Sequence, residues 1–107
     1  MQKQSLNSLG FECHEMSKSK GFWDEERNDG ECIALMHSEL SEALEALRHG
    51  VPTSAKNPDF TELEEEMADT VIRILDYCAA RSLDIDGAVH AKMAYNEGRP
   101  MRHGKRF

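Results

Sequence analysis

The chain has 107 residues, of which 31% are charged and 39% hydrophobic, and its formal net charge is −7. This length and composition predict a single globular domain over residues 1–107, and the acidic balance argues against binding to nucleic-acid polymers or anionic membranes. The sequence shows neither a secretory leader nor a run of about 20 apolar residues, so we expect a cytoplasmic protein with no membrane span.

The first predicted element is a helix from about Gln2 to Lys18. Its apolar residues recur at helical intervals, at Leu6, Leu9, Cys13 and Met16. Gly21 ends this helix, and the charged loop that follows contains the only tryptophan, Trp23. Trp23 is suited to stacking on a nucleobase, but it is equally suited to covering the edge of the core.

A second helix is predicted to begin at a cap formed by Asn28 or Asp29 and to end at Arg48, before Gly50. Its apolar residues form one stripe, which contains Ile33, Met36, Leu40, Ala43, Leu44 and Leu47. Glu39 and Glu42 are three residues apart, so their carboxylates are neighbours on one flank of this helix.

A third helix is predicted to start after a capping box of Thr61 and Glu64 and to run to about Arg81. Its apolar residues cover about half of its circumference, which favours contacts on two sides, one of them with another subunit. Glu66 and Asp69 border this apolar arc with the same three-residue spacing. Arg73 follows Asp69 by four residues and either forms a simple ion pair with it or orients it.

Two helices with matched acidic edges can dock so that four carboxylates converge: Glu39, Glu42, Glu66 and Asp69. Each residue alone is an ordinary solvated charge, but four together repel one another unless a cation lies among them. Oxygen ligands without histidine or cysteine favour Mg²⁺, or Mn²⁺, over zinc. This pattern predicts an enzyme that acts on phosphates.

A fourth helix is predicted between a cap at Asp84 or Asp86 and the breakers Gly98 and Pro100. Three polar residues lie on one of its faces at i, i+4 and i+7: Lys92, Asn96 and Arg99. They form either a solvated basic helix end or a set of phosphate and sugar contacts. The basic residues of 101–107 either extend those contacts or form a loose tail.

These motifs resemble those of MazG-like nucleoside triphosphate pyrophosphohydrolases, of the all-α NTP-pyrophosphatase superfamily. The resemblance rests on Glu39-x-x-Glu42 and Glu66-x-x-Asp69, and extends to Gly21–Trp23 and Lys92–Pro100. It implies Mg²⁺-dependent hydrolysis of nucleoside or deoxynucleoside triphosphates to the monophosphate and pyrophosphate. It also implies that the four carboxylates hold metal, that Glu39 or Glu42 is the base, and that Lys92 and Asn96 bind substrate. Arg99 and Trp23 are further candidates for binding substrate.

The fold expected from both lines of reasoning is an all-α, compact bundle of about four helices, completed as a homodimer or homotetramer. One alternative function is a related activity, the hydrolysis of phosphoribosyl-ATP. Another is a non-enzymatic helical module whose acidic edge binds a basic partner. The second alternative predicts no Mg²⁺ dependence and little effect of Glu66→Gln.

Overall fold

The computed structural model describes residues 3–106, and these residues form four α-helices and one short 3₁₀ turn. The elements are α1 (Leu6–Ser19), α2 (Asp29–Arg48), α3 (Glu62–Ala80), α4 (Ile85–Glu97) and η1 (Met101–Gly104). No strand is present among these residues, and an isolated bridge pairs Thr53 with Thr61. The predicted all-α fold with four helices is confirmed.

Each helix begins at a polar side chain that accepts a backbone N–H of the first turn. The caps of α1 to α4 are Ser5, Asn28, Thr61 and Asp84. Asn28, rather than Asp29, caps α2, and the predicted capping box of Thr61 with Glu64 is present. The predicted start of the first helix, Gln2, lies outside the described residues, and α1 itself begins only after Ser5.

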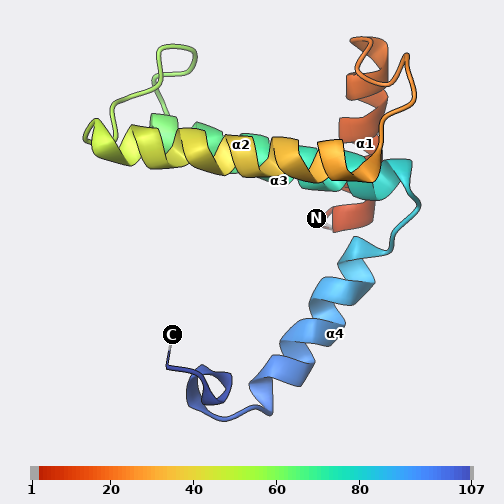
Figure 1. Ribbon diagram of the computed structural model, residues 1–107, viewed down its shortest axis with the longest axis vertical. Coiled ribbons are helices and arrows are strands. Elements are labelled where there is room, and N and C mark those ends of the chain that lie inside the picture. The colour runs from red at the N-terminus through yellow and green to blue at the C-terminus, as the bar shows by residue number, and fades with distance from the viewer. Residues whose placement is uncertain (1–2, 107) are drawn as a thin grey trace.

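Helices α2 and α3 lie side by side and antiparallel, and α1 crosses their end near the C-terminus of α3 (Figure 1). The seams between these helices bury small and medium-sized residues: Cys32, Ala43, Ala46, Leu75 and Cys78. Gly10 allows the close crossing of α1 over α3, because a Cβ at this position would lie 2.9 Å from the backbone oxygen of Leu75. The three helices α1, α2 and α3 therefore form the packed body of the molecule.

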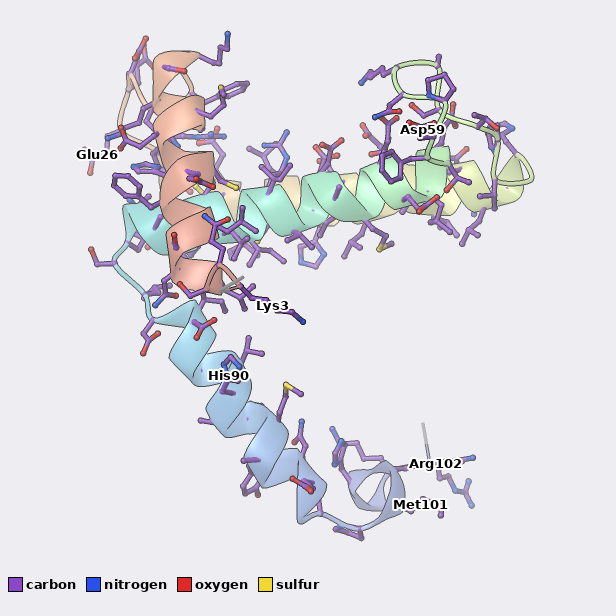
Figure 2. All side chains as sticks on the ribbon, turned by 180° about the vertical axis from the view of Figure 1, so that it is seen from behind. Lys3, Glu26, Asp59, His90, Met101 and Arg102 are labelled. Carbon is purple, nitrogen blue, oxygen red and sulfur yellow. The ribbon has the colours of Figure 1, made fainter. Side chains whose placement is uncertain are left out.

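Helix α4 contacts α1 at its beginning and then extends away from the body (Figure 1). In Figure 2, His90 marks α4, and Met101 and Arg102 mark the turn η1 that follows it. The radius of gyration is 16.2 Å, whereas a compact chain of this length has a value of about 13 Å. None of the described helices combines the length and the apolar character that crossing a membrane requires.

The loop between α2 and α3 is tied to α3 by one buried serine. The Ser54 hydroxyl donates to Oε1 of Glu65 at 2.5 Å and accepts the backbone N–H groups of Lys56 and Asn57 at 3.1 Å. These bonds satisfy backbone donors that would otherwise be left unpaired in the loop. They hold Lys56 close enough to the acidic edge that its charge acts on Asp69.

Candidate functional site

Glu39 is the most buried carboxylate of the acidic edge, with 8% of its surface exposed. It projects from α2 toward α3, where Nε of Arg73 donates to its Oε1 at 2.7 Å. Its second oxygen, Oε2, is buried and has no hydrogen-bond partner. A buried charged oxygen without a partner costs free energy, so this oxygen is available for a ligand.

Glu42 and Glu66 join Glu39 in one cluster, in which oxygens of the three carboxylates lie within 4.8 Å of one another. Oε2 of Glu66 is also buried without a hydrogen-bond partner. Burial, a hydrogen bond to Glu42 and the nearby negative charges raise the pKa of Glu66 to about 7. This carboxyl is therefore partly protonated at neutral pH, and a cation among the three groups would displace that proton.

Asp69 lies at the margin of the cluster, and its side chain is more exposed than that of Glu39. Desolvation and the charge of Glu39 raise the pKa of Asp69, while Lys56 and Arg73 act in the opposite direction. The predicted ion pair of Arg73 with Asp69 does not form, because Arg73 reaches across the seam to Glu39 instead. The structure thus brings three of the four predicted carboxylates together and places Asp69 beside them.

A cleft of about 320 Å³ opens next to these carboxylates, between α1 and α3. One wall contains Glu39, Asp69, Ile72, Arg73 and Asp76, and the other contains Cys13, Met16, Ser17, Lys20, Phe22 and Arg27. The cleft therefore combines carboxylates, cations and apolar groups around one space. This combination suits a ligand that has both a polyanionic part and an apolar part.

Lys20, Phe22 and Arg27 are residues of this cleft that sequence reasoning missed. They lie in the turn and loop between α1 and α2, where neither periodicity nor spacing distinguishes them from ordinary surface residues. Sequence reasoning also missed Lys56, which lies in the loop between α2 and α3, where no periodic pattern distinguishes it. The signal that pointed to this region was the family resemblance of Gly21–Trp23, which includes Phe22.

Trp23 does not line the cleft. It connects the loop between α1 and α2 to α3. Its indole N–H donates to the two oxygens of Asp76 at 3.0 and 3.2 Å. Its ring meets His14 edge-on with centroids 5.2 Å apart, and Nδ1 of His14 lies 2.7 Å from Asp76. Of the two roles predicted for Trp23, this geometry favours covering the core edge, while the adjacent Phe22 faces the cleft.

The structure does not bring Lys92, Asn96 and Arg99 to the carboxylates of the same chain. They lie on α4 and beyond its end, where the cationic groups of Lys92 and Arg99 lie 4.8 and 5.5 Å from the ring centroid of Tyr95. Oδ1 of Asn96 is buried without a hydrogen-bond partner. If these residues bind the ligand of the cleft, they cannot do so from the position that α4 has in a single chain.

Comparisons of this chain with protein-family models, with curated proteins and with solved structures found no match.

Proposed function

We propose that this chain is a MazG-like nucleoside triphosphate pyrophosphohydrolase, which hydrolyses nucleoside or deoxynucleoside triphosphates to the monophosphate and pyrophosphate in the cytoplasmic nucleotide pool. The observation that carries the proposal is the pair of buried, unpartnered oxygens, Oε2 of Glu39 and Oε2 of Glu66. They belong to one carboxylate cluster that borders a cleft with cationic and apolar walls.

The donor set supports Mg²⁺, with Mn²⁺ as a substitute, because it consists of carboxylate oxygens. Glu39, Glu42 and Glu66 would hold the ion, with Asp69 at the margin of the cluster. Mg²⁺ bound there would neutralise part of the charge of a triphosphate and acidify a water molecule.

The side chains of the cleft would divide the remaining tasks between them. Lys20 and Arg27 would bind phosphate oxygens, and Phe22, 56% exposed, would pack against the base. Arg73 would act as a positioning residue, because it holds Glu39 and frees the other oxygen of that carboxylate. Glu39 is the member of the three-carboxylate cluster that lines the cleft, and Glu42 is its exposed member, so either of them could accept a proton from a water bound at the cluster.

The test is release of pyrophosphate from the eight common NTPs and dNTPs and from phosphoribosyl-ATP, with and without Mg²⁺. We expect hydrolysis of at least one NTP or dNTP, and loss of at least about 100-fold in Glu66→Gln. The control is Glu45→Gln on the neighbouring helix α2, since Glu45 is exposed and its ion pairs among the described residues are with Arg48 and His49. Activity on phosphoribosyl-ATP alone would replace the proposed substrate with that alternative.

Binding of Mg²⁺ gives a second readout that does not depend on the substrate. An ion that binds the native state adds about 2.7 kcal/mol to the free energy of unfolding at a concentration 100-fold above its dissociation constant. Mg²⁺ should therefore raise the melting temperature of the wild type and of Glu45→Gln, but much less that of Glu66→Gln. Absence of any Mg²⁺ effect, together with absence of hydrolysis, would favour the interaction module.

A further inference from the structure

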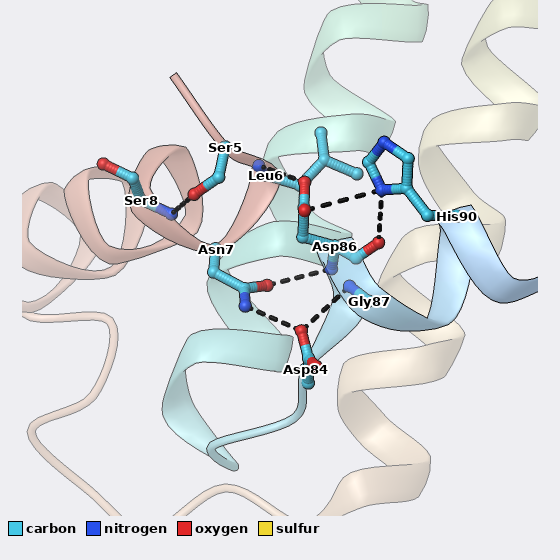
Figure 3. Close-up of polar contacts among 8 residues, drawn as sticks. All are labelled: Ser5, Leu6, Asn7, Ser8, Asp84, Asp86, Gly87 and His90. Atoms are coloured by element: carbon cyan, nitrogen blue, oxygen red, sulfur yellow. Dashed lines mark hydrogen bonds and ion pairs between the residues drawn. The ribbon is translucent and has the colours of Figure 1, made fainter. Parts of the chain in front are cut away.

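The start of helix α4 is tied to the start of α1, and α4 points away from α2 and α3 (Figures 1 and 3). The backbone N–H of Leu6 donates to Oδ1 of Asp86 at 2.9 Å, and the backbone N–H of Asp86 donates to Oδ1 of Asn7 at 2.9 Å. No residue of α4 is buried. Within one chain, the cations that face a polyanion at the carboxylates must therefore come from the loops beside them.

The loop that joins α2 to α3 brings one such cation to the acidic edge. Ser54 is the one buried residue of positions 49–61, and its hydroxyl accepts the backbone N–H of Lys56 at 3.1 Å. The same hydroxyl donates to Oε1 of Glu65 on α3 at 2.5 Å. Glu65 precedes Asp69 by four residues, so these two side chains are neighbours on one face of α3. Ser54 therefore fixes Lys56 beside the face of α3 that carries Asp69.

This loop is closed by hydrogen bonds rather than by an apolar core. The backbone N–H of Ser54 donates to the carbonyl of Phe60 at 2.9 Å, and that of Glu62 donates to the carbonyl of Pro52 at 2.8 Å. Pro52 and Pro58 restrict the backbone further. Such a loop presents its exposed side chains in a fixed place, which is what binding residues on loops require.

The ammonium of Lys56 is available to an anion. None of the ion pairs among residues 3–106 includes Lys56, whereas Lys18 is paired with Glu15 at 2.6 Å. Desolvation and the charge of Glu39 raise the pKa of Asp69, and the charge of Lys56 opposes them. Lys56 therefore acts on the acidic edge without being consumed by any of its carboxylates.

The acidic edge lies between this lysine and the cleft. Ile72 and Asp69 of α3 line the cleft, and Glu66 of the carboxylate cluster follows them toward the N-terminus of the helix. Glu65, the next residue, holds the loop through Ser54. The helix rises by about 10 Å from Ile72 to Glu65, which is comparable with the length of an extended triphosphate chain.

We propose that Lys56 binds the β- and γ-phosphates of the substrate, and pyrophosphate after hydrolysis, at the end of the acidic edge away from the cleft, and that Ser54 is its positioning residue. Resting on the proposed function, this contact fixes the direction of the substrate. The base lies in the cleft near Phe22 and the metal ion at the carboxylates, so the triphosphate points toward the α2–α3 loop. A compact ammonium with three donors suits a terminal phosphate group.

The test is binding of inorganic pyrophosphate to the full chain in the presence of Mg²⁺, measured by calorimetry. Lys56→Met should raise the dissociation constant at least about tenfold, because it removes a charge-assisted contact but keeps a side chain of similar length. Lys18→Met is the matched control, since it changes the net charge equally at a lysine paired with Glu15 on α1. Equal effects of the two substitutions, or no binding of pyrophosphate to the wild type, would overturn the proposal.

The positioning role is tested by Ser54→Ala, which leaves the charge of Lys56 in place but removes its anchor. Ser54→Ala should raise the dissociation constant of pyrophosphate at least about threefold. The double variant with Lys56→Met should bind no more weakly than Lys56→Met alone, because Ser54 acts through Lys56. Additive losses would mean that Ser54 acts independently of Lys56, and would overturn its positioning role.

Two further readouts separate a phosphate contact from a structural role. The rise in melting temperature on adding Mg²⁺ should persist in Lys56→Met, because Lys56 does not hold the ion. Loss of this response would show that Lys56 supports the carboxylates instead, against the proposal. Binding of nucleoside monophosphates should not change in Lys56→Met, and its loss with pyrophosphate binding intact would overturn the direction of the substrate.

None of these binding measurements depends on turnover, so their failure is distinguishable from failure of the proposed activity. Where hydrolysis occurs, the Michaelis constant for the triphosphate should rise at least about tenfold in Lys56→Met. Hydrolysis that is unchanged in this variant would leave the proposed activity standing and overturn the role of Lys56. Absence of hydrolysis, with pyrophosphate binding that requires Lys56, would overturn the activity and retain the phosphate contact.

Discussion

At the scale of single residues, the acidic edge depends on one cation. Arg73 is two-thirds buried and forms the ion pair that neutralises Glu39, whose side chain is 10% exposed. Removing one member of a buried pair leaves the other charge desolvated without compensation, which costs more than the pair itself contributes. Removing one member of the exposed Arg48–Glu45 pair leaves no desolvated charge behind, because water solvates both side chains.

Arg73→Met should therefore lower the free energy of unfolding by about 1–3 kcal/mol, as measured by urea denaturation. Arg48→Met should change it by less than about 0.5 kcal/mol. Adding Glu39→Gln to Arg73→Met removes the stranded charge and should restore part of the loss. Equal effects of the two arginine substitutions would show that the Arg73–Glu39 pair is no more important than a surface pair.

At the scale of elements, the sequence predicted the helices and several of their caps, because these depend on neighbours in the chain. The capping box of Thr61 and Glu64 does not depend on what α3 packs against. The apolar stripe of α2 likewise follows from the helical period alone. Partners across the seam depend on how two helices dock. The predicted partner of Arg73 was therefore wrong: the sequence neighbour Asp69 lies four residues away, but Glu39 lies closer in space.

The candidate site, like the helices, could be predicted from the sequence where it depends on spacing along one helix. It could not be predicted where it depends on how distant segments meet. The shared spacing predicted that four carboxylates would converge, and three of them do: Glu39, Glu42 and Glu66. The direction of α4 depends on a capping bond between Asn7 and Asp86. These residues are nearly 80 positions apart, so no local sequence pattern predicts their contact. The position of Lys92 relative to the carboxylates could not be derived from its position on a helix face alone.

Gly10 sets how closely α1 can cross α3. Alanine is the better helix former by about 1 kcal/mol, so Gly10→Ala would stabilise an isolated helix. A Cβ here would meet the backbone of Leu75, which cannot rotate away as a side chain could. We expect Gly10→Ala to lower the free energy of unfolding by about 1–3 kcal/mol, because overpacking outweighs propensity.

Gly30→Ala is the matched control for this prediction, since a Cβ at Gly30 meets only Oδ1 of Asn28, at 3.5 Å. This substitution should be neutral or stabilise the protein by up to about 1 kcal/mol in the same urea titration. A stabilised Gly10→Ala variant would mean that α1 can shift on α3 without loss of packing.

At the scale of the whole molecule, stability and charge are linked. The chain carries a net charge of −7, and the acidic cluster concentrates part of it between α2 and α3. Repulsion within the cluster should therefore lower the free energy of unfolding whenever metal is absent.

This repulsion should give the metal-free protein an unusual dependence of stability on pH. The pKa of Glu66 is raised from 4.5 in the unfolded chain to about 7 in the folded one, so between these values the native state binds more protons. Stability must then fall as pH rises through this window, whereas a carboxylate with a depressed pKa would make it rise. Deprotonation of Glu66 places a further negative charge beside Glu39 and Glu42, which is the physical source of the loss.

We expect the melting temperature of the chelator-treated wild type to fall between pH values of about 5.5 and 7.5 by more than that of Glu66→Gln. Glutamine has the shape of glutamate but no charge to lose, and the difference between the proteins cancels the titrating groups outside the carboxylate cluster. Both should be measured at one protein concentration, because assembly also changes the melting temperature. Parallel pH profiles would show that ionisation of Glu66 does not lower the free energy of unfolding. The repulsion that a cation is proposed to relieve would then be absent.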